Sequence, residues 1–123
     1  MEFDIFSKEI IGSAIEVHRL LGPGLLESAY EECMAFELIN KGLSIERQKP
    51  VPIVYKQIRL NCGYRLDLLV ERSVIVELKS IEAIAPVHEA QMLTYMRFSN
   101  VKTGLLINFN VTVLKNGLKR YVL

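Results

Sequence analysis

The sequence of 123 residues has little of several features that define special protein classes. It holds only two cysteines, Cys33 and Cys62, with no CxxC pair and no matching histidine spacing, which excludes a zinc knuckle and a disulfide framework. No apolar run approaches the roughly 18 residues that span a bilayer, and the N-terminus is acidic where a signal peptide is basic. These absences predict a cytoplasmic protein with no membrane partner.

Net charge is also small, at +1, which by itself argues against a strongly basic nucleic-acid binder. The charge is unevenly spread, however, because residues 1–40 carry −6, residues 41–80 carry +4 and residues 81–123 carry +3. This asymmetry is compatible with a basic face and an acidic back. The length and the 50% hydrophobic content predict one domain over residues 1–123 with a single core.

The order of elements follows from hydrophobic periodicity and from turn residues. Apolar residues recur at helical spacing before and after the break at Gly22-Pro23-Gly24, and later stretches change to the two-residue period of strands. Asn116-Gly117 is a strong signal for a two-residue hairpin turn. The sequence therefore predicts an α/β fold with helices at 3–21, 25–41 and 87–98, and strands at 51–55, 60–70, 74–79, 103–109, 111–114 and 118–122.

The short connection Glu71-Arg72-Ser73 allows the register of one hairpin to be predicted. If these three residues form the loop, the numbers of opposed residues sum to 144, and Asp67 lies across from Glu77. Side chains alternate along a strand, so Lys79 shares the face of Glu77, and the neighbouring leucines and valines, Leu66 and Leu68 included, point the other way. Two carboxylates and one lysine are thus expected on one face of an apolar sheet.

Two readings of this charged group remain open at the level of the sequence. Like charges opposite each other in an apolar sheet need compensation, and a divalent cation with hard oxygen ligands, Mg²⁺ or Mn²⁺, supplies it. Such an ion also orients a water and stabilises charge on a phosphoryl oxygen, which Lys79 would assist. The alternative is a plain cross-strand network in which Lys79 neutralises Glu77.

The same residues resemble a known signature. Tyr64-Arg65-Leu66-Asp67, followed after nine residues by Glu77-Leu78-Lys79, is similar to the PD-(D/E)xK motif of the restriction-endonuclease-like nuclease superfamily. Gln91 and Tyr95, four apart on the predicted third helix, resemble the QxxxY of the helicase-nuclease branch of that superfamily. In addition, Gly24-Leu25-Leu26-Glu27-Ser28-Ala29-Tyr30 matches the pattern of the GxxExxY family, which is assigned to the same superfamily.

The resemblance implies a restriction-endonuclease-like αβββαβ core. In that core a mixed central sheet is flanked by helices, here with an extra N-terminal helix and a C-terminal β-hairpin. It also implies metal ligation by the Asp67 and Glu77 carboxylates and the Leu78 carbonyl, with Lys79 as the catalytic lysine. Glu27 would be a helix-borne acid that reaches the same site, and Gln91 would support the site or the nucleic-acid backbone.

Three helix residues, Glu27, Tyr30 and His88, have a structural alternative to a role in the site. Glu27 lies in the first turn of its helix, where an acid is also stabilised by the helix dipole. Tyr30 is expected either to orient Glu27 or to pack in the core, and Tyr95 shares a helix face with Gln91 over the predicted site. His88 either binds a phosphate or caps the first turn of its helix, and capping is the favoured reading.

The function expected from the resemblance is phosphodiester hydrolysis of DNA or RNA by a nuclease that depends on Mg²⁺ or Mn²⁺. The alternative is a non-catalytic module on the same scaffold that binds nucleic acid or protein. Basic residues of 41–80 are candidates for phosphate contacts, although the sequence does not show which of them share a face. Little chain remains outside the core to build specificity elements, which favours a partner or an oligomer, and a homodimer is one such assembly.

Overall fold

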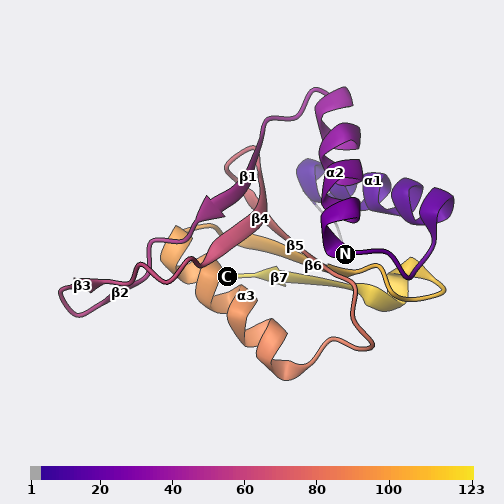
Figure 1. The fold of residues 1–123 in the computed structure, drawn as a ribbon. Coiled ribbons are helices and arrows are strands. Elements are labelled where there is room, and N and C mark those ends of the chain that lie inside the picture. The colour runs from indigo at the N-terminus through magenta and orange to yellow at the C-terminus, as the bar shows by residue number, and fades with distance from the viewer. Residues whose placement is uncertain (1–3) are drawn as a thin grey trace.

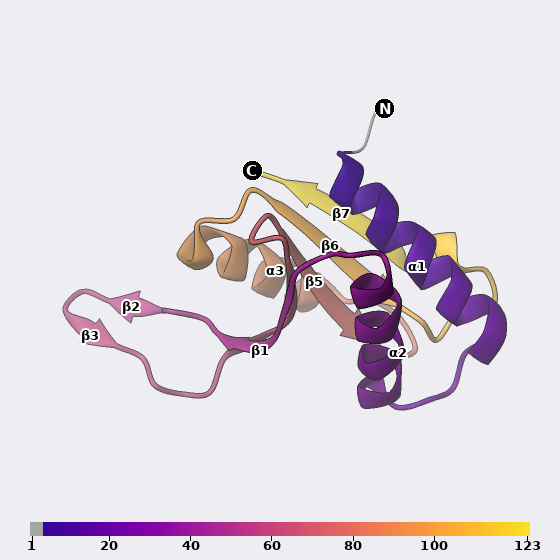
Figure 2. The same ribbon diagram turned by 90° about the horizontal axis from the view of Figure 1, so that it is seen from above.

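The computed structural model describes residues 4–123. Helices α1 and α2 cover one face of a central sheet, and helix α3 lies on the other face (Figures 1 and 2). The described elements are α1 (Ile5–Leu21), α2 (Glu27–Asn40), β1 (Ile45–Pro50), β2 (Val54–Tyr55), β3 (Ile58–Arg59), β4 (Arg65–Val70), β5 (Val74–Lys79), α3 (Pro86–Ser99), β6 (Thr103–Asn108), the 3₁₀ turn η1 (Leu114–Gly117) and β7 (Leu118–Val122).

The main sheet has the strand order β1-β4-β5-β6-β7. The β5–β6 pair is parallel, joined by α3 as a crossover, and the other neighbouring pairs are antiparallel. A parallel pair needs such a crossover because its strands cannot be joined by a tight turn. The elements α2, β1, β4, β5, α3 and β6 confirm the predicted αβββαβ core, with α1 as the extra N-terminal helix.

Two hydrophobic clusters hold the layers together, one on each face of the sheet. The first joins α1 and α2 to the sheet through residues such as Ile10, Met34 and Leu105, and the second joins α3 to the opposite face through Met92 and Met96. Tyr30 stacks on Phe109 in the first cluster, with ring centroids 4.3 Å apart. The central strands are therefore buried on both faces, as their continuous apolar sequences require.

The bounds of the three helices and of β5 agree with the predicted ones to within a few residues. Phe3, the predicted first residue of the first helix, lies outside the described residues. In the part of the chain that the structure describes, no helix has the length and apolarity needed to cross a membrane.

The prediction that residues 51–55 form the first of the three strands, at an edge or a bulge, is wrong for the main sheet. The strand that pairs with β4 is β1, the charged segment just before it, and only Val54–Tyr55 of the predicted strand is β structure. Those two residues pair with β3 in a two-stranded arm, defined here as residues 51–64, that projects from the body (Figures 1 and 2). An edge strand is exposed along one side, so β1 tolerates charges that a central strand would exclude.

The predicted pairing of 111–114 with 118–122 is also wrong. Residues 114–117 form η1, and the antiparallel partner of β7 is β6, with Thr103 opposite Val122 and Ile107 opposite Leu118. A two-residue type I′ turn needs a positive φ at both central residues, and neither Asn116 nor Gly117 has one. The C-terminal antiparallel pair therefore consists of β6 and β7, joined by a longer connection.

Candidate active site

The Asp67 and Glu77 carboxylates meet where β4 and β5 separate. The pairs Leu68–Val76, Leu69–Ile75 and Val70–Val74 confirm the predicted register. Beyond these pairs, backbone N–H groups donate to carboxylate side chains of the opposite strand instead of to its carbonyl groups. The Asp67 N–H donates to Glu77 Oε2 at 2.8 Å, and the Leu78 N–H donates to Asp67 Oδ2 at 2.8 Å. Each carboxylate is thus held by the backbone of the opposite strand.

Burial makes this pair costly to ionise. Glu77 is 5% exposed, and its burial, followed by the neighbouring charge of Asp67, raises the pKa of Glu77 to about 8. Burial likewise raises the pKa of Asp67. Lys79 lowers both pKa values only weakly, because its ammonium forms no ion pair with a carboxylate of residues 4–123. A closed network in which Lys79 neutralises Glu77 is therefore not what the structure shows.

Glu27 comes to this region from the first turn of α2. Its Oε2 accepts a hydrogen bond from the Ser80 N–H at 3.3 Å, and the Ser80 hydroxyl donates to the Leu25 carbonyl at 2.6 Å. Ser80 directly follows β5, so it ties the end of that strand to the start of α2. The charge of Glu27 contributes to the raised pKa of Glu77, which places the two acids in one electrostatic environment.

Tyr30 does not bond to Glu27. Its hydroxyl donates to the Gly22 carbonyl at 2.6 Å and accepts from the Leu25 N–H at 3.2 Å, while its ring is fully buried. These two bonds fix the Gly-Pro-Gly turn that precedes α2. Tyr30 therefore acts on the loop that leads to Glu27 rather than on its carboxylate.

The three α3 residues are placed differently from one another. Tyr95 is 5% exposed, and burial and then the charge of Glu77 raise its pKa, so its phenol lies within the electrostatic influence of the acid pair. Gln91 lies one turn earlier on the same side of the helix and is half-buried. His88 Nδ1 accepts from the Ala85 N–H at 2.9 Å and so caps the start of α3.

Asn108 organises the loop that follows β5 and is absent from the sequence-based site. Its amide exchanges two hydrogen bonds with the backbone of Ile81, at 3.1 and 2.9 Å, and it is 2% exposed. It also lies opposite Lys79 in the parallel β5–β6 pair. Asn108 therefore fixes the chain directly after Lys79, and no local pattern in the sequence indicates this contact across the sheet.

Glu31 and Gln48 are further residues that the sequence-based prediction missed. Gln48 Nε2 donates to Glu31 Oε1 at 2.5 Å and to Asp67 Oδ1 at 3.4 Å, so one amide bridges α2 to the carboxylate pair. Arg47 pairs with the other oxygen of Glu31 at 2.9 Å. The signal for Glu31 was its spacing of four from Glu27, which puts both acids on one face of α2.

Gln48 interrupts the sheet at the level of Asp67. Its φ of 52° is left-handed, and it makes no strand pair with Asp67 although the register of β1 and β4 continues on both sides. Leu66 and Leu68, predicted to share a face, pack in the clusters on opposite faces of the sheet. The alternation of β4 therefore breaks at Asp67. Strain of this kind in a residue other than glycine costs about 1–2 kcal/mol and persists where other contacts hold it.

This strain can be measured with a pair of variants. Gln48→Gly and Gln48→Ala both remove the bridging amide, but only glycine adopts φ of 52° without steric strain. The greater flexibility of glycine in the unfolded chain lowers the stability of Gln48→Gly and offsets part of this advantage. We therefore expect Gln48→Gly to be more stable than Gln48→Ala by about 0.5–1 kcal/mol of unfolding free energy. Urea unfolding at pH 7 measures the difference, and an Ala variant as stable as the Gly variant would contradict it.

The donor set agrees with a hard divalent cation. Mg²⁺ is usually held by one or two carboxylates with waters completing its shell, and Asp67, Glu77 and the Leu78 carbonyl supply carboxylate and carbonyl oxygen. Among the residues that the structure describes, no Lys, Arg or His side chain forms an ion pair with either carboxylate, and a bound cation would supply that positive charge. Within residues 4–123, no three His, Cys, Asp or Glu side chains form a group that could hold a metal ion by themselves. A site here would thus depend on the carbonyl and on water.

Comparison with protein families confirms the resemblance seen in the sequence. The model of the PD-(D/E)XK nuclease superfamily matches residues 4–121, which includes every element described above except the last residue of β7. Comparisons with curated proteins and with solved structures found no match. The match covers nearly the whole chain and the motif residues lie together at the split between β4 and β5, so the chain belongs to the PD-(D/E)XK nuclease superfamily.

Proposed function

We propose that this protein is a member of the GxxExxY family and a metal-dependent nuclease. Its site comprises Asp67, Glu77, Lys79 and Glu27. The observation that carries the proposal is the buried Asp67–Glu77 pair, held by backbone N–H groups of the opposite strands and paired with no Lys or Arg side chain of residues 4–123. Membership of a nuclease superfamily supports a nucleic-acid substrate. A carboxylate pair inside an apolar sheet is a cost to folding that a purely structural role does not explain.

Each residue has a role in this proposal. Asp67, Glu77 and the Leu78 carbonyl would hold Mg²⁺ or Mn²⁺, and the bound ion would polarise a phosphoryl oxygen and lower the pKa of a bound water. Lys79 holds the attacking water or the phosphate oxygen on which negative charge builds. Glu27 adds a third carboxylate at the edge of the site, and Gln91 and Tyr95 orient these groups from α3. Water oxygen bonds to phosphorus, a phosphoester bond breaks, and the leaving oxygen takes up a proton.

A cleavage assay tests the proposal. Plasmid, single-stranded DNA and RNA are incubated with Mg²⁺ or Mn²⁺ and, in parallel, with EDTA. We expect cleavage only with the metal, and a loss of about 100-fold or more in Glu77→Ala and Lys79→Ala, since each removes a group that acts on the reacting phosphate. Glu82→Ala, at an exposed position after β5, is the control that should cleave normally. Cleavage in EDTA, or cleavage unchanged in both site variants, would refute the catalytic assignment.

One observation favours the alternative, a non-catalytic module that binds nucleic acid. The described residues 4–123 contain no group of three His, Cys, Asp or Glu side chains arranged to hold a metal, whereas catalysis needs a firmly placed ion. This reading predicts association that weakens with salt and persists in EDTA, without cleavage in any metal. The same assay, run beside a binding measurement, distinguishes the two functions.

A further inference from the structure

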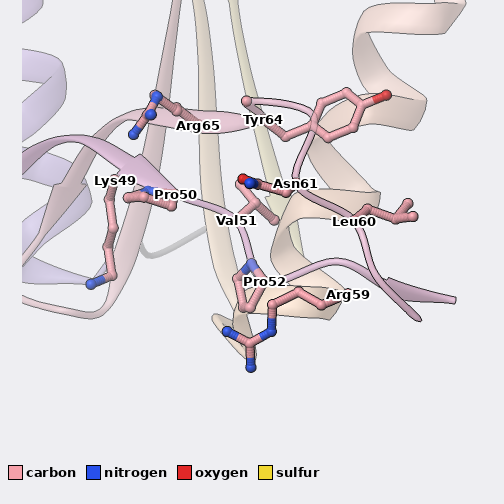
Figure 3. A pocket seen from close by; sticks show the side chains of 10 residues that line it. Lys49, Pro50, Val51, Pro52, Arg59, Leu60, Asn61, Tyr64 and Arg65 are labelled. Atoms are coloured by element: carbon pink, nitrogen blue, oxygen red, sulfur yellow. The ribbon is translucent and has the colours of Figure 1, made fainter. Parts of the chain in front are cut away.

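The arm, residues 51–64, forms a basic pocket with the ends of the strands that flank it. A cavity of about 500 Å³ is lined by Lys49 at the end of β1, Arg59 and Asn61 of the arm, and Tyr64 and Arg65 where the chain returns to the sheet (Figure 3). The sequence from Lys49 to Arg65 holds four basic residues and no acidic one. The pocket therefore has a single sign of charge in a protein whose net charge is +1.

The three cations of this pocket differ in how far they are already paired. Lys49 contacts Glu46 at 2.7 Å, and Arg65 Nη1 donates to the Gln48 carbonyl at 3.3 Å. Arg59 is exposed and has no hydrogen-bond or ion-pair partner among residues 4–123. A guanidinium with free donors at the mouth of a basic cavity is suited to a phosphate, which it binds with two parallel hydrogen bonds.

The pocket adjoins the start of β4, the strand that carries Asp67. Tyr64 lies edge-on to Tyr95, with ring centroids 6.4 Å apart, and burial together with the charge of Glu77 raises the pKa of Tyr95. Arg65 begins β4 two residues before Asp67, a rise of about 7 Å along a strand. Because a nucleic-acid strand advances about 3.4 Å per nucleotide along a duplex, that rise corresponds to about two nucleotides. A strand lying in the pocket would thus pass the carboxylates within a few nucleotides.

We propose that the arm pocket binds a backbone phosphate of the nucleic-acid strand that enters the site, with Arg59 as its principal contact. The identity of the ligand rests on the proposed function, while the site itself rests on the pocket and its charge. The pocket adds a phosphate contact outside the acid pair, whose negative charge repels the backbone of the substrate. It also explains why the chain inserts a projecting two-stranded arm between β1 and β4.

The test measures binding separately from cleavage. The full chain is titrated in EDTA with a fluorescent 20-nucleotide DNA strand and with its duplex, at KCl concentrations from 50 to 300 mM. Arg59→Ala should release one counterion fewer when it binds the single strand. The plot of log affinity against log salt concentration should therefore be less steep by about 0.7, which corresponds to an affinity about five- to tenfold lower at 50 mM KCl. Arg59→Lys should keep the slope, and Lys115→Ala, an exposed cation on η1 outside this pocket, should bind like the wild type.

Failure of this proposal is distinguishable from failure of the proposed function. An unchanged affinity and slope in Arg59→Ala, or a wild-type protein that binds neither probe at 50 mM KCl, would overturn the pocket as a phosphate site, whatever the cleavage assay shows. Loss of affinity in Arg59→Ala without cleavage by the wild type would support the pocket and refute the nuclease. If Arg59→Ala binds nucleic acid like the wild type but has a different sedimentation coefficient, the phosphate site would be overturned in favour of a protein partner at the arm.

Discussion

Glu77→Gln should make the metal-free protein more stable at pH 8, by about 2–4 kcal/mol of unfolding free energy, while it abolishes cleavage. Glutamine keeps an oxygen that accepts the hydrogen bond of the Asp67 N–H but removes the charge that burial and Asp67 disfavour. A buried carboxylate whose pKa is raised from 4.5 to about 8 opposes folding once it is ionised. The opposite effects on stability and activity are typical of a functional group held in a destabilising position.

The pH dependence of this effect has a definite sign. Because the pKa of Glu77 is higher in the folded protein than in the unfolded chain, the folded state holds the extra proton between pH 4.5 and 8. The wild type therefore loses stability as pH rises through this range, and Asp67, whose pKa is also raised, acts in the same direction. Asp4, whose pKa is lowered to about 2, acts oppositely and only at acidic pH. Glu77→Gln should flatten the decline between pH 5 and 8.

Urea unfolding from pH 5 to 8.5 measures both effects. Glu82→Gln, at an exposed position on the following loop, is the matched control and should follow the wild type. Mg²⁺ at pH 8 should stabilise the wild type, since a ligand that binds only the folded state raises its stability, and should leave Glu77→Gln nearly unchanged. A wild type whose stability does not fall between pH 5 and 8 in EDTA would contradict the burial of an ionisable Glu77.

Gly117→Ala should destabilise the protein by about 3 kcal/mol. A Cβ atom at this position would lie 2.1 Å from the carbonyl oxygen of Asn108 and 3.2 Å from a methyl group of Val111. The first contact is with backbone, which cannot rotate away, so η1 or the end of β6 has to shift, and overpacking of this kind typically costs 1–3 kcal/mol. For a chain of 123 residues this corresponds to a fall in melting temperature of about 10 °C.

The consequences of Gly117→Ala extend to the candidate site. Asn108 holds Ile81 through two hydrogen bonds and lies opposite Lys79, so a displaced Asn108 also loosens the chain after β5. Gly12→Ala is the control, because a Cβ on this α1 residue meets only Lys41 Nζ at 3.7 Å and alanine favours a helix. Thermal unfolding followed by circular dichroism compares the two. A Gly117→Ala variant as stable as Gly12→Ala would show that η1 moves freely.

Local patterns were sufficient for much of the fold and for the centre of the site. The helix bounds follow from three- and four-residue spacing and from the Gly-Pro-Gly break, and the three-residue connection after β4 sets the register of its hairpin. That register brings Asp67 to Glu77 because both lie close to one tight turn, where few alternative pairings exist. The prediction failed where pairing joins distant segments. β1 was missed because it carries few apolar residues. The partner of β7 was predicted wrongly because packing across the sheet, and not a local turn, decides it.

The two carboxylates and Lys79 can be assigned to one strand pair from the sequence alone, because a short hairpin leaves its residues a single register. The residues that surround them are brought there by long-range packing. Gln48 links Glu31 to Asp67 with a backbone that departs from regular strand geometry, and Asn108 fixes the chain after Lys79. The arm brings Arg59 into one pocket with Lys49 and Arg65 beside β4. These contacts join residues 17 or more positions apart, and no periodicity encodes them, because they depend on how whole layers pack.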